Sequence, residues 1–315
     1  MTKALFAMAA LACLAATPAP LTAHATDTND TMRRIRDPQG GLIVIAHRGC
    51  HDPAPWHGWG SAPENSALAL QRCAQMGVDV METDVHKTRD GTLVIMHDDT
   101  VDRMTEGKGA IEKLTLAQIK ALHLRANEGG VTAPLTDQTM LTLDEMLALA
   151  KGRIVLNLDV KAMIYAEVVD AVMRAGAADR VIVKTFGGLG SAPLASIAPF
   201  DKVPFAVIPM SADDRGLDIP EVMTRQMTGP HKPVAFELPV VPVEALPAIA
   251  DKARALKVRV WVNTLFQGFV IGAGNDIDAL RKPDAVWGDL YRRGVTMIQT
   301  DDPEAMLRFR DGGHL

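Results

Sequence analysis

The chain has 315 residues, of which 48% are hydrophobic, and this is enough for one large folded core. Its formal net charge at pH 7 is −5. Because an acidic surface repels a phosphate backbone, the composition argues against nucleic acid as the main partner.

The N-terminus has the pattern of an export signal. Lys3 precedes the apolar run 4–16, and Ala23-His24-Ala25 follows as a small-x-small cleavage pattern. The order predicts a signal peptide over residues 1–25, cleaved after Ala25, and therefore a periplasmic or secreted protein. The apolar run is too short for an uncleaved spanning helix, so we expect no stable membrane insertion.

Residues 42–315 are predicted to form one catalytic domain, preceded by a polar, flexible segment over residues 26–41. Apolar runs typical of strands buried on both faces alternate with helical stretches. This alternation predicts an α/β protein, a closed (β/α)8 TIM barrel with its chemistry at the carboxyl ends of the strands. The expected strands are 42–46, 79–84, 154–159, 181–184, 203–208, 234–238, 258–262 and 296–299. The expected helices include 65–76, 142–151, 165–175 and 243–256.

Chemically active residues follow the first two predicted strands. His47, Arg48 and Gly49 come directly after the first strand, whereas Glu82 and Asp84 lie two residues apart on the second. This spacing places both carboxylates on one face of the strand. Two adjacent like charges need a cation between them, and carboxylate oxygens suit Mg²⁺ or Ca²⁺. The second strand is therefore predicted to hold one divalent metal ion.

A β-hairpin is predicted to leave the barrel after the second strand. Asp90-Gly91 is a strong two-residue turn signal, and a turn at these positions would place His97 directly opposite Asp84. A small insertion over about residues 104–140, with 115–122 helical, is expected to follow.

Cys50 and Cys73 are the two cysteines that remain after signal cleavage. A disulfide requires their Cα atoms to be within bonding range, which sequence does not establish. We expect a free, buried Cys73 rather than a disulfide.

The ordered motifs of the chain resemble those of the glycerophosphodiester phosphodiesterase family. No one motif is specific, but together they occur in family order along nearly the whole mature chain. The motifs are His47-Arg48-Gly49, Pro63-Glu64-Asn65-Ser66, Glu82-Thr83-Asp84-Val85, Arg89-Asp90-Gly91, His97-Asp98-Asp99-Thr100-Val101-Asp102-Arg103, Leu143-Asp144-Glu145-Met146-Leu147, Asp159-Val160-Lys161, Trp261 and Thr300-Asp301-Asp302-Pro303.

The resemblance implies a role for each matching side chain. His47 and His97 are the expected catalytic acid and base. Glu82, Asp84 and Asp159 are the expected metal ligands, although the family usually has a glutamate at the position of Asp159. Substrate and phosphate binding is expected from Arg48, Glu64, Lys161 and Trp261.

Several positions carry a second interpretation. Trp261 is equally well explained as core packing, and the shortened spacing to Asn263 leaves the role of that residue open. His51 is expected to be structural or on the surface, and Asp301 and Asp302 are expected only to cap the following helix. The long segment 50–62, with two tryptophans, is expected to shape substrate access.

The implied reaction is metal-dependent hydrolysis of glycerophosphodiesters to sn-glycerol 3-phosphate and an alcohol. The attacking group is either water or the neighbouring glycerol hydroxyl. An alternative is a lysophospholipase D or sphingomyelinase D-like enzyme on the same barrel. A non-catalytic phosphodiester-binding protein is a third hypothesis, against which the presence of both histidines argues.

Overall fold

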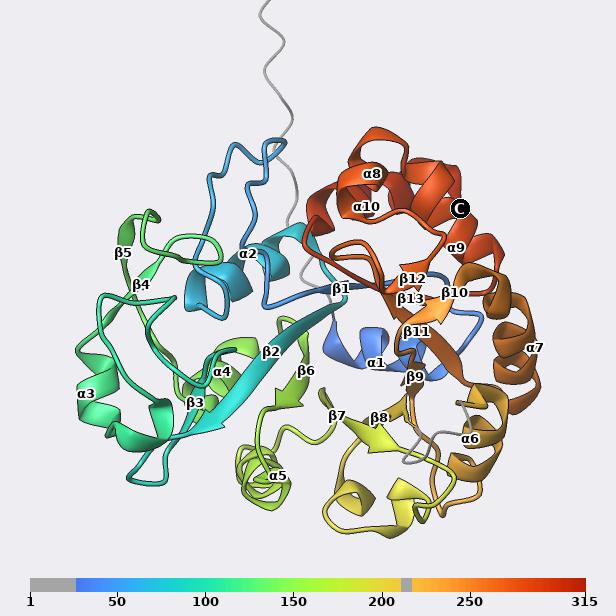
Figure 1. The fold of residues 1–315 in the computed structure, drawn as a ribbon, viewed down its shortest axis with the longest axis horizontal. Helices are drawn as coiled ribbons and strands as arrows, with labels where there is room; N and C mark the ends of the chain where they lie inside the picture. Colours follow the sequence, from blue (N-terminus) through green and yellow to red (C-terminus); the bar gives the residue numbers. More distant parts are fainter. Residues whose placement is uncertain (1–26, 211–216) are drawn as a thin grey trace, which may run out of the picture.

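Eight parallel strands close into a barrel in the computed structural model of the chain, which describes residues 27–210 and 217–315 (Figure 1). β1 pairs with both β13 and β2, and these two pairings complete the ring. The predicted TIM barrel and its eight strands are confirmed, whereas the predicted signal peptide lies outside the described residues. The barrel strands are β1 (Ile43–Ala46), β2 (Val80–Lys87), β6 (Val155–Val160), β7 (Val181–Gly187), β8 (Phe205–Pro209), β9 (Ala235–Glu237), β11 (Arg259–Asn263) and β13 (Met297–Thr300).

Helices surround the strands and bury the outward-facing apolar side chains of the barrel (Figure 1). Local sequence fixes where they start: Thr142 and Glu145 form a reciprocal capping box at the start of α4, for example. The outer helices are α2 (Ala67–Met76), α4 (Leu143–Ala150), α5 (Tyr165–Arg174), α6 (Ile219–Gln226), α7 (Leu246–Leu256), α8 (Asp276–Arg281), α9 (Asp289–Arg292) and α10 (Pro303–Phe309). Short 3-10 or π segments are Ile111–Lys113, Leu194–Ser196, Phe200–Lys202, Val243–Ala245, Asp284–Gly288 and Arg310–His314, and the short strands β10 (Val241–Pro242) and β12 (Val270–Ile271) pair with each other.

The barrel interior changes from apolar to polar toward the carboxyl ends of the strands. Near the amino ends, Val80, Val155 and Ile182 belong to one apolar cluster. Alternate residues of a strand share a face, so Glu82 and Lys184 follow on the same inward face as Val80 and Ile182. The polar mouth of the barrel is therefore a direct result of the period of two in these strands.

The segment over residues 26–41, predicted to be flexible, contains the helix α1 (Thr28–Arg36). Its Met32 and Ile35 are buried in the apolar cluster at the amino ends of the strands. Buried Arg259 of β11 donates hydrogen bonds to the carbonyl oxygens of Ile35 and Asp37. The prediction was wrong because the segment is polar on average while a single face of its helix is apolar.

The hairpin excursion is present, but its register differs from the prediction by one residue. β2 pairs with β3 (Leu93–Ile95) so that Val85 faces Ile95, which places Asp84 opposite Met96 rather than His97. The amide of Gly91 donates to the carbonyl of Thr88, and Gly91 has a φ of 82°. The turn is thus a three-residue loop that ends in a left-handed glycine, not a two-residue turn.

The predicted insertion after the hairpin forms a separate small layer beside the barrel. It contains α3 (Leu116–Lys120) and the antiparallel strands β4 (His123–Arg125) and β5 (Leu135–Thr139). Its own buried cluster includes Met104, Ile119 and Leu124, which explains how it stays ordered away from the main core. In Figure 1 this layer lies to one side of the barrel.

Cys50 and Cys73 form a disulfide with a Cα–Cα distance of 5.3 Å, contrary to the predicted free thiol. The bond joins the loop after β1 to α2. The sequence could not show this because the approach of the two residues depends on the packing of α2 against the barrel. Separately, none of the helices in the described part of the chain has the length and apolar character needed to cross a membrane.

Candidate active site

Three carboxylates meet at the mouth of the barrel, as the sequence predicted. Parallel pairing puts Asp84 of β2 beside Asp159 of β6, and Glu82 lies one inward step below Asp84. One oxygen from each of the three groups lies within 4.8 Å of the other two. Asn65, held at a φ of 57°, donates from Nδ2 to Asp84 Oδ2 at 2.8 Å and fixes its orientation. The cluster is able to hold a divalent cation through oxygen ligands.

The charge of this cluster is balanced by cations from neighbouring strands. Lys161 Nζ lies 2.8 Å from Asp84 Oδ1 and 3.0 Å from Asp159 Oδ2, and Lys184 Nζ lies 3.4 Å from the same Asp159 oxygen. Burial opposes ionisation of Asp84, but Lys161 and other nearby cations hold its pKa well below the usual range. Burial and the adjacent Asp84 instead raise the pKa of Glu82 to about 8. The cluster thus combines strongly acidic and weakly acidic carboxyl groups.

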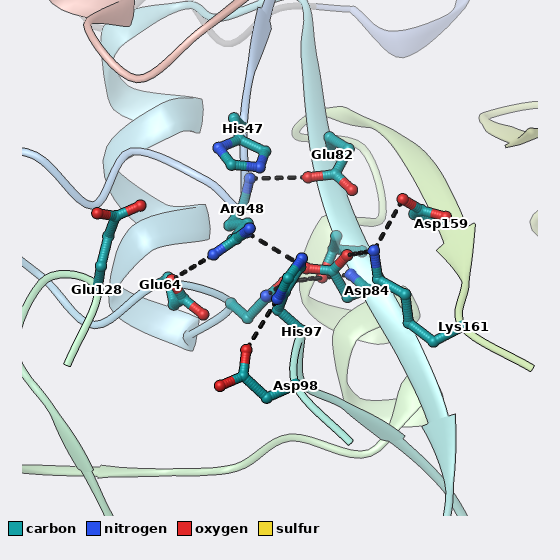
Figure 2. A network of polar contacts seen from close by, with 12 residues as sticks. His47, Arg48, Glu64, Glu82, Asp84, His97, Asp98, Glu128, Asp159 and Lys161 are labelled. Atoms are coloured by element: carbon teal, nitrogen blue, oxygen red, sulfur yellow. Dashed lines mark hydrogen bonds and ion pairs between the residues drawn. The ribbon is translucent and has the colours of Figure 1, made fainter. Parts of the chain in front are cut away.

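Arg48 connects the carboxylate cluster to Glu64, as Figure 2 shows. Its backbone amide donates to Glu82 Oε2 at 2.9 Å, and its Nη1 donates to Glu64 Oε2 at 3.0 Å. Its Nε lies 3.8 Å from Asp84 Oδ2 without a hydrogen bond. Glu64 is fully buried and orients the guanidinium, which confirms the predicted proximity of these two residues.

His47 reaches the mouth from the end of β1 and is held by Asp301. Its Nδ1 lies 2.8 Å from Asp301 Oδ1, so the neutral ring donates from Nδ1 and leaves Nε2 as the basic nitrogen. Burial lowers the pKa of His47, although its hydrogen bond to Asp301 opposes this. The same Asp301 oxygen is 3.2 Å from Nε2 of buried His51. Asp301 therefore holds two histidines. The predicted capping role is wrong, because the N-cap residue of α10 is Asp302 and its side chain makes no capping hydrogen bond.

His97 approaches the same mouth from the hairpin, close to Asp84 and Arg48 in Figure 2. Its Nδ1 lies 2.8 Å from Asp98 Oδ1. Arg103 donates to Asp98 and, from Nη2, to Glu64 Oε1 at 2.7 Å. Hydrogen bonds from Arg103 and His97 lower the pKa of Asp98 to about 2. Glu64 is therefore shared by Arg48 and Arg103.

Trp261 belongs to the core, not to the substrate wall. Its side chain is 0% exposed, and its Nε1 donates to Asn263 Oδ1 at 3.1 Å. Asn263 in turn donates to Glu237 Oε1 at 2.9 Å, and Lys184 Nζ lies 5.5 Å from the centroid of the indole ring. The predicted substrate contact of Trp261 is wrong, because the residue faces inward one layer below the mouth. Its structural role is to support Asn263 and Lys184.

The long loop after β1 packs against helices. Arg308 of α10 lies over the ring of Trp56, and Arg72 of α2 lies over Trp59. His57 lies beside Trp59 and forms a hydrogen bond to Glu304 of α10. The loop is thus secured on two sides, while its role in substrate access stays a prediction.

Sequence reasoning missed Asp301, His51, Arg103 and Lys184 as members of this site. Asp301 and Lys184 could have been found from the period of two in their strands. Asp301 follows Met297 and Gln299 on the inward-facing alternation of β13, and Lys184 follows the inward-facing Ile182 of β7. His51 and Arg103 lie on loops without a period. Their positions become known only when the barrel and the insertion are folded together.

At the mouth of this TIM barrel lie a carboxylate cluster, two carboxylate-bound histidines and three adjacent cations. These are groups that a phosphodiester hydrolase requires. The profile of the glycerophosphoryl diester phosphodiesterase family matches residues 47–305. The chain belongs to this family and is a phosphoric diester hydrolase.

Individual relatives agree with this assignment. A glycerophosphodiester phosphodiesterase of Caldanaerobacter subterraneus is 28% identical over 281 residues, which cover 86% of this chain and 99% of that protein. A glycerophosphoryl diester phosphodiesterase structure from Parabacteroides distasonis has a TM-score of 0.66 at 18% identity, covering 92% of this chain and 93% of the other. A phosphodiesterase of Oleispira antarctica, solved with the product sn-glycerol-3-phosphate, has a TM-score of 0.59 at 20% identity and covers 86% and 97% of the two chains. At these identities the two structures establish the shared fold.

Proposed function

We propose that the protein hydrolyses glycerophosphodiesters to sn-glycerol 3-phosphate and an alcohol. The observation that carries the proposal is the convergence of two carboxylate-held histidines, His47 and His97, on one cluster of carboxylates and cations. A phosphodiester is a stable anion, and its cleavage requires charge neutralisation, a deprotonated nucleophile and a protonated leaving group. The mouth of this barrel has groups for each of these requirements.

We infer that one divalent ion, Ca²⁺ or Mg²⁺, is held by Glu82, Asp84 and Asp159. Lys161 and Lys184 pair with Asp84 and Asp159, but neither forms an ion pair with Glu82, and the converging oxygens of the three carboxylates suit a hard ion. When bound, such an ion supplies positive charge that neutralises the phosphate oxygens. Asp159 is one methylene shorter than the usual family glutamate, so its contribution to binding is expected to be the weakest of the three.

The chain's own side chains would perform the remaining steps. Arg48 and Lys161 are positioned to bind the non-bridging oxygens of the phosphate, since both already face the carboxylate cluster. With Nδ1 of each histidine engaged by a carboxylate, Nε2 is the atom that exchanges a proton with the substrate. One histidine removes a proton from the nucleophile, and the other protonates the departing alkoxide.

A lipid-derived diester is a second candidate substrate, and one feature favours it. Phe186 of β7 and Ile208 of β8 are paired on the inward-facing alternation, above Lys184 and Ala206. Phe186 is 57% exposed there, an unusual position for a large apolar side chain. Such an apolar wall beside the phosphate site could receive one acyl chain, as a lysophospholipase D would require.

A substrate panel tests the proposal. Purified protein with Ca²⁺ or Mg²⁺ is incubated with glycerophosphocholine, lysophosphatidylcholine and sphingomyelin, and both choline and sn-glycerol 3-phosphate are measured. Preferred turnover of glycerophosphocholine supports the proposal. Preferred turnover of lysophosphatidylcholine, lost in Phe186→Asp but retained in Phe186→Leu, supports the lipid candidate instead. Binding of all three without turnover of any would indicate a non-catalytic binding protein.

We also propose that the protein acts in the periplasm or outside the cell. The predicted signal peptide is supported by the pairing of Cys50 with Cys73, because structural disulfides persist in oxidising compartments. N-terminal sequencing of protein from the periplasmic or secreted fraction should begin at Thr26. Protein that retains residues 1–25 and stays in the cytoplasm would contradict export.

A further inference from the structure

His51 is buried beside the catalytic centre and has acceptor atoms on both sides of its ring. It is 1% exposed and lies in the loop after β1. Its Nδ1 is 2.8 Å from Asn127 Oδ1, and its Nε2 is 3.2 Å from Asp301 Oδ1. In this structure the amide oxygen of Asn127 faces Nδ1 and a carboxylate oxygen faces Nε2, so both ring nitrogens act as donors. The form of histidine that satisfies both contacts is the imidazolium cation.

The surrounding charges favour a cation at this position. On its own loop, Asp52 Oδ1 lies 3.5 Å from Nδ1 of His51, and Asp301, after β13, lies 3.2 Å from Nε2. Asp302 also interacts with the ring, but burial raises its pKa to about 7 and weakens its contribution of negative charge. His47, which directly follows β1, is a titratable basic group nearby, and the centroids of the two rings are 6.5 Å apart. Burial opposes protonation, but the hydrogen bonds and charges of Asp301 and Asp52 raise the pKa of His51 well above its usual value.

Asp301 is shared between this cation and the catalytic His47 through one oxygen atom. Oδ1 is 2.8 Å from His47 Nδ1 and 3.2 Å from His51 Nε2. We propose that His51 is a positioning residue whose imidazolium orients Asp301 toward His47 and shares the negative charge of that carboxylate. The proposal rests on the proposed function, in which His47 exchanges a proton with the substrate.

The other catalytic histidine is organised in the same way. Asp98 holds Nδ1 of His97, and the guanidinium of Arg103 binds the same carboxylate with both Nε and Nη2 at 2.8 Å. Each catalytic histidine thus contacts a carboxylate, and that carboxylate contacts a buried or half-buried cation. A permanent charge occupies the outer position next to Asp98, and His51 occupies the equivalent position next to Asp301.

The insertion contributes to this arrangement through Asn127. Its backbone N–H donates to the backbone carbonyl of Ala62, and its backbone carbonyl accepts from the backbone N–H of Glu64. Asn127 therefore fixes both the loop that carries His51 and the residue that orients Arg48. The acceptor that keeps His51 doubly protonated comes from outside the barrel.

With a neutral residue at position 51, the negative charge of Asp301 would no longer be shared with an imidazolium and would act on His47 alone. The pKa of His47 should then rise. For charges 6.5 Å apart in an effective dielectric of about 20, the expected change is about 1 to 2 pH units. His97 should not change to the same extent, because its carboxylate is balanced by Arg103.

The test compares His51→Gln, His51→Ala and a matched control. Gln retains an N–H group for Asp301 without the charge, whereas Ala removes both. His231→Gln is the control, because His231, which precedes β9, donates from Nε2 to the Phe200 carbonyl and lies outside the site. With saturating divalent ion, the limb of the kcat/KM profile that reports His47 should move to higher pH in His51→Gln, and the other limb should stay. His51→Ala should in addition lower kcat about 10-fold with KM nearly constant.

A second measurement requires no turnover. In ¹H–¹⁵N correlation spectra of the wild-type protein, both ring nitrogens of His51 should carry protons at pH 8, where exposed histidines are neutral. Comparison of the His47 titration in wild type and in His51→Gln then tests the coupling directly. If no phosphodiester is hydrolysed, the proposed function fails while these spectra still decide the role of His51.

Two results would overturn the inference. One is a His51 ring that is neutral at pH 8 in the wild-type spectra. The other is a folded His51→Gln protein whose His47 titration and pH profile match those of wild type and of His231→Gln.

Discussion

The two histidines that we propose as acid and base are held by groups of side chains, here called arms, that come from different parts of the chain. The His47 arm consists of His47, Asp301 and His51 and rests on the barrel strands β1 and β13. The His97 arm consists of His97, Asp98 and Arg103 and rests on the hairpin and insertion. The side chain of His47 is 12% exposed, and that of His97 is 35% exposed. The chain thus combines one largely enclosed arm with one that is more accessible to solvent.

This difference shows how a barrel can complete its active site with material outside the barrel. The hairpin is a continuation of β2, so the strand that carries Glu82 and Asp84 also leads to His97. Glu64 joins the two parts, because it binds Arg48 next to His47 and Arg103 on the other arm. Substitutions in either arm should therefore alter catalysis at one shared phosphate site, and the size of the effect on kcat should differ between the arms.

Removal of the metal should have the largest effect, because the carboxylate cluster lies between the arms and serves both. EDTA should abolish hydrolysis, and added Ca²⁺ or Mg²⁺ should restore it. Asp159→Glu should change the relative activity with the two ions, because the longer side chain reaches farther. Activity is measured as released choline. Full turnover by exhaustively chelated protein would contradict the metal assignment.

Loss of either histidine should come next. His47→Ala and His97→Ala should each reduce kcat by roughly 10² to 10⁴-fold, the range for positioned proton transfer. The double variant should lose much less than the product, since the two rings act on one reaction. With p-nitrophenyl phosphodiesters the leaving group needs no proton, so the variant that lacks the acid should be partly rescued. Fully multiplicative losses, with neither variant rescued, would show that the shared acid and base assignment is wrong.

The carboxylates behind the histidines should distinguish the two arms. Asp301→Asn should reduce kcat on the order of 10²-fold, because an amide can hold the buried His47 in the wrong tautomer. Asp98→Asn should cost about 10-fold, because solvent can replace a lost contact at the more exposed His97. Steady-state kinetics of both variants at saturating ion measure the difference. Equal losses would mean that the exposure of the arms is irrelevant to their function.

Loss of the disulfide should have the smallest effect on turnover and should act on the His47 arm alone. Replacing Cys50 and Cys73 with serine should lower the free energy of unfolding by about 3 kcal/mol, because the unfolded chain gains freedom. Since Cys50 precedes His51, kcat should also fall, by less than about 10-fold. Denaturant unfolding and kinetics with and without reductant measure both effects. A reductant should leave the double-serine variant unchanged, and a wild type equally stable under reducing conditions would contradict the prediction.

The barrel could be predicted from the sequence because its strands are short, mainly apolar runs that alternate with helical stretches. Glu82, Asp84 and Asp159 lie at or near the carboxyl ends of these runs, so the carboxylate cluster could be predicted from strand position alone. The hairpin register was wrong because Asp90-Gly91 fits both a two-residue and a three-residue loop, and a shift of one residue reverses the face of His97.

The parts that failed depend on contacts between distant segments. Asp301 and His47, which contact each other, are 254 residues apart in the sequence, and Arg103 and Glu64 are 39 residues apart. Trp261 is ambiguous in sequence because a tryptophan at a strand end suits either a core or a binding wall, and only its depth in the barrel separates the two. These pairings become defined once all eight strands are in place.

The two ends of the described fold are joined at one buried carboxylate. Arg34 of α1 donates to Asp79 Oδ1, and Arg310, just after α10, donates to Asp79 Oδ2, each at 2.6 Å. If either end detaches, a carboxylate buried at 1% exposure loses half of its counter-charge, which is strongly unfavourable. Detachment of α1 is thereby linked energetically to detachment of the segment after α10. Because Asp79 links the first and last helices of the described fold, we expect the barrel to unfold as one cooperative unit, without earlier unfolding of either end.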